Sequence, residues 1–214
     1  MSEKEGVIQF AYALTPGDTG LAPALFAELS AWRSVLRDLD LLGEHPDRYG
    51  GFGYGNLSLR VPDGGFVITA SQTSGASQLR SQDLVRITDV DATGFRVDAI
   101  GEKPPSSESL THAMLYAADP DVNVVFHVHC PQIWRNREAL ALPSTAEEVP
   151  YGTPAMARAV ATLMAERRER PLLFVTAGHE DGVFAAGATA RDCGSLLVAC
   201  LADARAVATS GAQR

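Results

Sequence analysis

Hydrophobic residues recur every three or four positions in four stretches of this chain, which is the spacing of a helix with one buried face. The pattern predicts helices over residues 21–42, 106–117, 156–168 and 190–208. Gly43 stands where the first helix would end, because glycine tolerates the left-handed backbone of a C-terminal cap. Ser106 or Ser107 can cap the start of the second helix, and Pro120 ends it.

Shorter runs alternate between apolar and polar residues or are rich in β-branched residues, and these runs predict strands. The predicted strands cover residues 7–12, 57–61, 66–69, 84–88, 95–97, 123–129, 172–175 and 182–186. Residues 62–65 (Pro-Asp-Gly-Gly) predict a hairpin turn, and residues 89–94 predict another. Strands that alternate with helices and hairpins indicate an α/β fold with a mixed sheet covered on both faces.

The composition is that of an ordinary globular protein and changes this picture little. The chain has 214 residues, of which 46% are hydrophobic and 21% charged, so we expect one domain over residues 1–214. No stretch is long and apolar enough to span a bilayer. The first residues are acidic and lead to no small-residue cleavage site, so we expect no secretory signal. The spacing of the three cysteines matches no disulfide framework, and we expect core packing in a reducing cytoplasm.

The charge distribution excludes one class of partner. The formal net charge is −8, and the densest basic run is Arg167-Arg168-Glu169-Arg170, which Glu166 and Glu169 half-neutralise. Nucleic acid binding requires a basic face, so we interpret this run as a solvated helix end.

Three of the five histidines form a candidate metal site. His127 and His129 lie two apart on a predicted strand, so their side chains leave one face about 7 Å apart. His179 lies in a turn between two apolar strands, where Gly178 and Gly182 would let the backbone bend. Three imidazoles leave an open coordination position, which is typical of catalytic zinc. The alternative is that these are structural histidines satisfied by hydrogen bonds.

The other two histidines have weaker patterns. His45 lies in a polar loop with no evident role. His112 is four residues after Glu108 and on the same helical face, so we predict that it hydrogen-bonds near the site rather than binding the metal.

Residues 104–108 (Pro-Pro-Ser-Ser-Glu) form a second group at a predicted helix start. Hydroxyls and free N–H groups at a helix N-terminus suit a phosphate or carboxylate, although simple capping is the better explanation of Ser106 and Ser107 taken by themselves. Glu108, in the first turn beside an anion site and a metal, could accept and return a proton.

Small polar residues at two strand ends form a third group. Residues 55–58 (Gly-Asn-Leu-Ser) and 68–75 (Ile-Thr-Ala-Ser-Gln-Thr-Ser-Gly) could together build an uncharged anion cradle from backbone N–H groups. The alternative is two ordinary turns.

Taken together, these motifs resemble the class II aldolase/adducin family, which includes fuculose- and rhamnulose-type phosphate aldolases, ribulose-phosphate 4-epimerases and methylthioribulose-phosphate dehydratases. The matching pieces occur in the family's order: Gly55-Asn56-Leu57-Ser58-Leu59-Arg60, Val67-Ile68-Thr69, Pro105-Ser106-Ser107-Glu108, His112, Asp119-Pro120-Asp121-Val122-Asn123, His127-Val128-His129 and Gly178-His179. The resemblance implies a three-layer α/β/α sandwich around a mixed, largely antiparallel sheet. It also implies a homotetramer with active sites at subunit boundaries.

The resemblance assigns roles by position. It implies that His127, His129 and His179 bind Zn²⁺, or another divalent metal such as Mn²⁺ or Co²⁺, and that Glu108 is the catalytic carboxylate. It implies that the phosphate-contacting loops of the family correspond to Asn56, Ser74, Gly75, Ser106 and Ser107.

The chain departs from the family pattern at three places. The loop from Ala70 to Gly75 is longer than the usual Thr-Pro-Ser-Gly loop, and Glu180-Asp181 follows His179 where a glycine is common. No tyrosine follows Leu201, where some family aldolases carry a proton donor, and Tyr54 and Tyr151 are the candidate substitutes.

The residues and the resemblance lead to one functional prediction. We predict a cytoplasmic lyase that cleaves or forms an aldol bond in a hydroxy-carbonyl sugar or sugar phosphate, with a metal-stabilised enediolate. The alternatives are epimerisation or dehydration at the same site, or a non-catalytic adducin-like interaction module. That last branch is expected to lack the three metal histidines.

Overall fold

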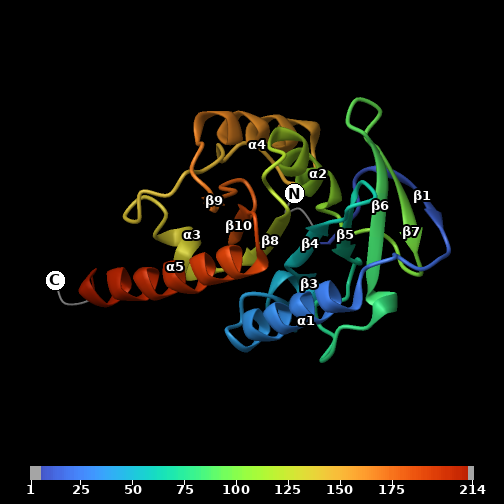
Figure 1. Ribbon diagram of the computed structural model, residues 1–214. Helices are drawn as coiled ribbons and strands as arrows, with labels where there is room; N and C mark the ends of the chain where they lie inside the picture. The colour runs from blue at the N-terminus through green and yellow to red at the C-terminus, as the bar shows by residue number, and fades with distance from the viewer. Residues whose placement is uncertain (1–5, 212–214) are drawn as a thin grey trace.

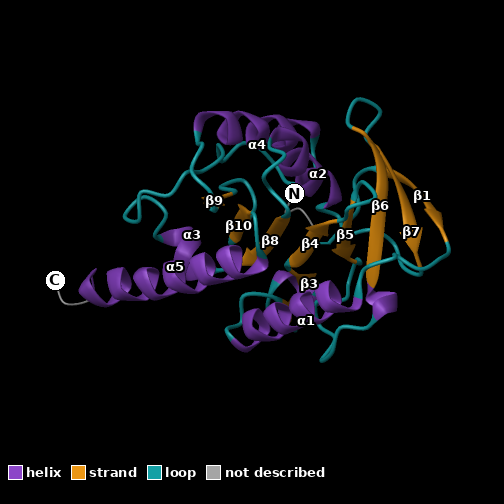
Figure 2. Cartoon of the chain, viewed as in Figure 1, coloured by secondary structure: helices purple, strands orange, loops and turns teal. Residues whose placement is uncertain are grey.

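A mixed sheet of eight strands lies between two layers of helices in the described chain (Figures 1 and 2). The computed structural model describes residues 6–211. The strands of the large sheet, in spatial order, are β1 (Ala11–Thr15), β7 (Arg96–Gly101), β6 (Leu84–Asp91), β5 (Phe66–Thr69), β4 (Asn56–Arg60), β8 (Val124–His129), β10 (Gly182–Gly187) and β9 (Leu172–Val175). Of these neighbours, β1 and β7 pair in parallel, and the others are antiparallel. This confirms the predicted mixed, largely antiparallel sheet.

Helices cover the sheet on both faces. They are α1 (Pro23–Asp38), α2 (Ser109–Ala118), α3 (Pro131–Arg135), α4 (Pro154–Glu166) and α5 (Ala190–Gly211). Helices α1, α3 and α5 pack on one face, and α2 and α4 pack together on the other. A second, two-stranded sheet pairs β2 (Gly43–Glu44) with β3 (Gly53–Tyr54). The predicted three-layer α/β/α sandwich is therefore confirmed. No helix in residues 6–211 is both long and apolar enough for a membrane span.

The alternation of side chains along β8 divides the interior into two cores. Val124, Phe126 and Val128 pack with α1 and α5, whereas Val125 packs with α2 and α4. The prediction that Phe126 and Val128 face the core is confirmed, since both are fully buried. Because successive residues of a strand point to opposite faces, the residues between them, His127 and His129, face the α2 side.

The cysteines also occupy predicted positions. Cys130, Cys193 and Cys200 are buried in the core formed with α1 and α5, and all three are free thiols. Burial raises the pKa of the Cys200 thiol to about 11, which keeps it protonated near neutral pH.

Two predicted boundaries are wrong for reasons that lie in tertiary contacts. The first strand covers 11–15 rather than 7–12, because its pairing with β7 begins at Ala11 and ends at Thr15. Helix α1 ends at Asp38, and Asp40 rather than Gly43 has the left-handed backbone, with φ 58°. The N–H groups of Asp40 and Leu41 return to the carbonyls of Arg37 and Leu36, at 2.9 Å each, which closes a Schellman cap.

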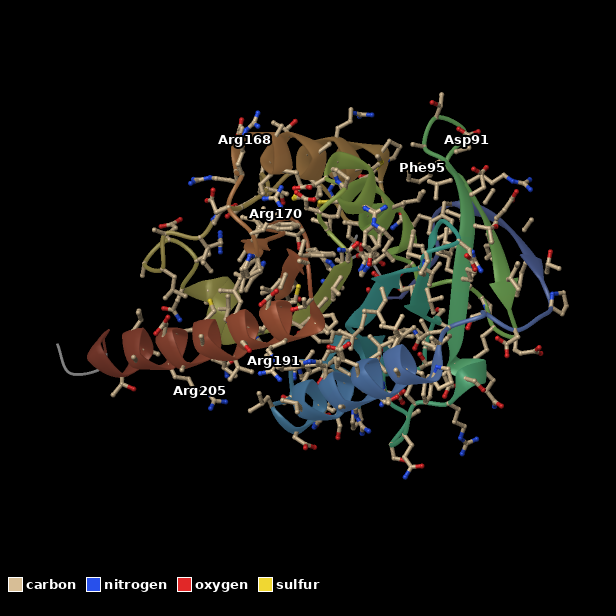
Figure 3. The ribbon with its side chains drawn as sticks, in the orientation of Figure 1. Asp91, Phe95, Arg168, Arg170, Arg191 and Arg205 are labelled. Carbon is tan, nitrogen blue, oxygen red and sulfur yellow. The ribbon has the colours of Figure 1, made fainter. Side chains whose placement is uncertain are left out.

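Most of the basic run that follows α4 is solvated, as predicted, but the Arg170 side chain is only 16% exposed. Arg167 and Arg168 are exposed, and Arg168 points outward from the end of the helix (Figure 3). Arg170 forms an ion pair with Asp119 at 2.7 Å. The ion pair of Arg170 joins the segment after α4 to the residue that follows α2. The run therefore does not act as a continuous basic face.

Candidate metal centre

His127 and His129 come from the centre of the sheet. In β8, His127 lies opposite Asn56 of β4 and Phe184 of β10, while His129 lies opposite Gly182. Both imidazoles are fully buried. Two ladders of hydrogen bonds hold this strand, so the two rings project from a backbone that has little freedom.

His179 reaches the same place from the turn between β9 and β10. Its N–H donates to the carbonyl of Thr176 at 3.0 Å, and its own carbonyl accepts from Gly182 at 3.0 Å. The prediction that the two glycines bend the backbone is wrong, because the left-handed residue of this turn is Asp181, with φ 62°. The glycines provide room instead: a Cβ on Gly182 would meet the side chains of Thr176 and His179.

The three imidazoles converge. One ring nitrogen from each of His127, His129 and His179 lies within 4.8 Å of the others. The Nε2 atoms of His127 and His129 are 3.2 Å apart. The ring centroids are 4.7–5.2 Å apart. Such a group can hold one divalent cation, which is the arrangement that the sequence predicted.

The burial of these rings selects the form that binds metal. Desolvation, and next the nearby His179, lower the pKa of His127 and His129 well below the usual value for histidine. Both rings are therefore neutral near pH 7, with lone pairs available for coordination. The residues present fit a metal that prefers nitrogen ligands.

Glu108 lies beside this trio. Its Oε1 is 3.5 Å from Nδ1 of His179, and its Oε2 accepts a hydrogen bond from Thr111 at 2.8 Å. The side chain is 2% exposed. Thr111 holds one carboxylate oxygen, while the other faces the histidines, as an acid/base residue requires.

The predicted serine cap of α2 is wrong. The helix begins at Ser109, and Glu108 occupies the cap position. Ser106 accepts from the N–H of Ser109 at 3.0 Å through its carbonyl, and its Oγ accepts from the N–H of Glu108 at 3.3 Å. Ser106 and Ser107 thus precede the helix by one turn and shape the bend that delivers Glu108 to the site.

Aromatic rings enclose the histidines. Tyr151 stacks on His179 with centroids 4.5 Å apart, and Phe184 stacks on His127 at 4.2 Å. Tyr49 contacts the ring of His129 edge-on at 4.7 Å. These rings fix the orientation of the imidazoles and limit access of water to them.

Tyr49 was missed by the sequence analysis. Its hydroxyl donates to Asp181 at 2.7 Å and accepts from Arg48 at 3.0 Å. The available signal in the sequence was the density of glycines in residues 49–56, which indicates a tightly turned loop. Tyr49 itself has a left-handed backbone in this loop, with φ 49°. Of the two predicted substitutes for the missing tyrosine, Tyr151 lies against His179. The hydroxyl of Tyr54 instead donates to Asp40 at 2.6 Å.

The remaining histidines lie outside the trio. Nδ1 of His112 is 2.7 Å from Oγ of Ser58, and its ring contacts Phe184. Burial lowers the pKa of His112 to about 3, so this ring is neutral. The ring of His112 packs against Phe184, which in turn stacks on His127. This agrees with the prediction that His112 hydrogen-bonds near the site and is not part of the trio. His45 is exposed, and its Nδ1 accepts from the N–H of Asp47.

A small polar cavity lies near the start of α2. Its volume is about 20 Å³. Its lining includes four of the predicted anion-binding residues, Asn56, Ser74, Ser106 and Ser107. The other lining residues are Gly6, Gly53, Gly55, Ala70, Ser71 and Gln72.

Gly75, the fifth predicted residue, does not line this cavity. A Cβ at that position would meet the carboxylate of Glu44 instead. Ser71 and Gln72 lie in the wall, and Gln72 has the left-handed φ of 56° that a glycine usually adopts. The longer loop therefore brings Ser74 to the cavity as predicted, but adds Ser71 and Gln72 and leaves Gly75 out.

A family match covers most of the chain, including the site. Residues 46–206 match the Class II Aldolase and Adducin N-terminal domain. The chain belongs to this family. The match includes all three histidines and Glu108, which agrees with the resemblance inferred from the motifs.

Curated relatives match over shorter segments. Methylthioribulose-1-phosphate dehydratase of Gluconacetobacter diazotrophicus is 36% identical over 100 residues, 46% of each chain. The enzyme of the same name from Microcystis aeruginosa is 41% identical over 76 residues, 35% of each chain. The matched segments thus span less than half the length of these relatives.

The fold is also found among solved structures. L-fuculose-1-phosphate aldolase from Thermus thermophilus has a TM-score of 0.68 at 19% identity, covering 90% of this chain and 96% of that one. At this identity the likeness shows the fold alone.

Proposed function

We propose that this protein is a metal-dependent lyase that removes water from a hydroxy-carbonyl sugar phosphate. The observation that carries the proposal is the carboxylate of Glu108, 3.5 Å from one of three converging, buried histidines. The similarity to methylthioribulose-1-phosphate dehydratases supports dehydration as the reaction.

His127, His129 and His179 would hold the cation. Three neutral nitrogen ligands suit Zn²⁺, and Mn²⁺ or Co²⁺ are alternatives. When bound, the metal would act as a Lewis acid that polarises the substrate carbonyl and stabilises an enediolate. The rings of Tyr151 and Phe184, which stack on two of the ligands, would keep this site dry.

Glu108 would move the proton. Its Oε1 would take a proton from the carbon next to the substrate carbonyl, while Thr111 keeps Oε2 in place. The same carboxyl group would then protonate the departing hydroxyl, which leaves as water. Asn56, Ser106 and Ser107, in the polar cavity beside the start of α2, would bind the far end of the substrate.

Aldol cleavage is the second candidate. It needs the same cation and the same carboxylate, and aldolases share this fold. It is the less favoured reaction, because the curated relatives that match this chain at 36% and 41% identity are named as dehydratases.

Product analysis tests the proposal. The protein would be incubated with phosphorylated and free ketoses and aldoses, with zinc, manganese or cobalt added and in parallel with a chelator. Loss of one water with metal and none with chelator is expected. Two carbonyl fragments would indicate aldol cleavage, and an isomer would indicate epimerisation. A protein that takes up none of these metals would favour an adducin-like interaction module.

The arrangement of the whole protein belongs to the same proposal. We infer a single domain over residues 1–214 that assembles into a cytoplasmic homotetramer. Light scattering of the purified protein tests the assembly, and a monomeric mass would contradict it.

A further inference from the structure

A buried arginine lies behind the loop that carries one wall of the polar cavity. Arg33 of α1 is 3% exposed. Its Nη2 donates to the carbonyls of Thr73 at 2.8 Å, Ser74 at 3.0 Å and Ala76 at 2.7 Å. Three carbonyl contacts to one buried guanidinium hold this loop in a single arrangement.

The charge of Arg33 is not neutralised nearby. Within residues 6–211 it has no carboxylate at ion-pair distance. Asp83, the acid that acts on it from further away, is paired with Lys103 at 2.7 Å. Backbone carbonyls rather than a carboxylate therefore surround the guanidinium, so its positive charge can act on an anion beyond the loop.

The loop directs hydrogen-bond donors away from α1. In a trans peptide the C=O of one residue and the N–H of the next point in opposite directions. The carbonyls of Thr73 and Ser74 point to Arg33, so the N–H groups of Ser74 and Gly75 point away from it. In the described chain, the N–H groups of residues 72–75 make no intramolecular hydrogen bond.

Of these two donor residues, Ser74 lines the cavity and Gly75 does not. Helices α1 and α2 cover opposite faces of the sheet (Figure 1). The cavity includes Ser106 and Ser107, which lead into α2, and Ser74 itself. Backbone N–H groups at the wall of a cavity are a known way to bind an anion.

The cavity contains an independent sign that a ligand binds there. Asn56 is 8% exposed, and its Oδ1 is buried without a hydrogen-bond partner. The described residues that line the cavity include no lysine, arginine or histidine. A hydroxyl of a ligand would satisfy this amide oxygen by donating to it, whereas an anionic oxygen would not. Any positive charge that attracts an anionic ligand must come from behind the wall.

We propose that Arg33 is the positioning residue for anion binding: it holds the loop of residues 73–76 so that the N–H of Ser74 turns away from α1, and it supplies positive charge to the cavity without touching the ligand. The inference rests on the proposed function, in which the ligand is the anionic end of the substrate. Arg33 thereby couples α1, on one face of the sheet, to substrate binding on the other.

Calorimetric titration of the full-length protein with inorganic phosphate tests this role. Arg33→Met is expected to weaken phosphate binding about tenfold or more, because it removes both the charge and three hydrogen bonds. Arg33→Lys keeps the charge but not the planar fork, so we expect a loss of about threefold or more. Zinc binding should remain at the wild-type level in both variants, since α1 does not carry a histidine of the trio.

Arg37→Met is the matched control. Arg37 lies one turn further along α1, and its Nη1 donates to the carbonyl of Ala76 alone, at 2.7 Å. Its removal should change phosphate affinity by less than about twofold, because Arg33 still holds the same carbonyl.

Three results would overturn the proposal. The first is that the wild-type protein binds no phosphate. The second is that the Arg33 variants bind phosphate as tightly as wild type does. The third is that Arg33→Lys loses phosphate binding and zinc binding to the same extent. If Arg33→Met does not fold, Arg33→Lys alone decides. No turnover is measured, so failure of the proposed reaction leaves this result unchanged.

Discussion

At the scale of single residues, the site separates two tasks between two kinds of side chain. The imidazoles of His127 and His129 are neutral because burial lowers their pKa, and a neutral ring has the lone pair that a metal ligand would need. Glu108 is buried beside them but keeps one oxygen held by Thr111. Because Thr111 holds one of its oxygens, the Glu108 carboxylate would exchange a proton with a substrate through its other oxygen.

Glu108→Gln is the direct test of this division. The amide keeps the size and hydrogen-bonding capacity of the side chain but cannot accept the proton, so we expect turnover to fall by about 10²- to 10⁴-fold. Zinc content, measured by atomic absorption, should stay unchanged. Full turnover with bound metal would show that another group moves the proton.

We expect His112 to make the free energy of unfolding fall at acid pH. Its folded pKa of about 3 lies below the ordinary value of 6.5, so the folded state favours the neutral ring. Its contribution to stability is therefore complete above pH 6.5 and is lost progressively as the pH falls from 6.5 toward 3. The slope is about 1.4 kcal/mol per pH unit.

The variant His112→Gln isolates this contribution. Glutamine can still hydrogen-bond to Ser58, but it does not titrate. Urea unfolding between about pH 7 and about pH 5 should show a weaker loss of stability than in wild type, by about 1 to 3 kcal/mol across the range. Parallel pH profiles for the two proteins would contradict the assigned pKa.

At the scale of elements, the site depends on how closely β10 and the turn before it approach the histidines. Gly182 lies opposite His129 in the ladder, and its Cα faces Thr176 and the ring of His179. The turn therefore delivers His179 only while this position has no side chain. The requirement is for space, since Gly182 is not among the residues with positive φ.

Gly182→Ala should displace His179. A Cβ would lie 3.1 Å from Nδ1 of that ring, and closer still to the Thr176 hydroxyl. We expect zinc affinity to fall about tenfold or more, with a loss of stability of about 1 to 3 kcal/mol. Competition with a chromogenic chelator measures the zinc affinity, and unfolding in denaturant measures the stability.

Gly64→Ala is the matched control for this variant. Gly64 lies in the hairpin between β4 and β5 with φ 93°, and a Cβ added there would meet no atom within 4 Å. It should lose about 1 kcal/mol through backbone strain and keep wild-type zinc affinity. If both glycine variants lose zinc equally, steric displacement of His179 is not the cause.

At the scale of the whole molecule, the metal would join parts of the fold that are distant in sequence. His127 and His129 belong to β8 in the centre of the sheet, while His179 belongs to the turn between the last two strands. A ligand that binds only the folded state stabilises it by mass action. Metal binding would thus couple the edge of the sheet to its centre.

Zinc should therefore raise the melting temperature. At a free concentration of about a thousand times Kd, the gain is about 4 kcal/mol. Calorimetry with zinc and with chelator measures it. His179→Ala should abolish most of this gain, whereas His45→Ala, which removes an exposed histidine outside the trio, should retain it. An equal gain in both variants would place the metal elsewhere.

The sequence by itself determined the features that repeat locally. Helical and strand periodicity predicted a mixed sheet covered on both faces, and the two-residue spacing of His127 and His129 placed both on one face of a strand. These features are readable because burial of one face imposes a period on neighbouring residues. The residue types around Glu108 and His179 suggested their roles and the ordered family motifs supported them, although no local period encodes their positions beside this pair.

Only the tertiary structure decided which distant residues meet. Tyr49 lies against His129, Gln72 replaces Gly75 in the wall of the polar cavity, and Arg33 binds a loop forty residues away. Such contacts depend on how the layers pack and on how loops of particular length close. No pattern of neighbouring residues contains that information, because the free energy of these contacts appears only when the whole chain is folded.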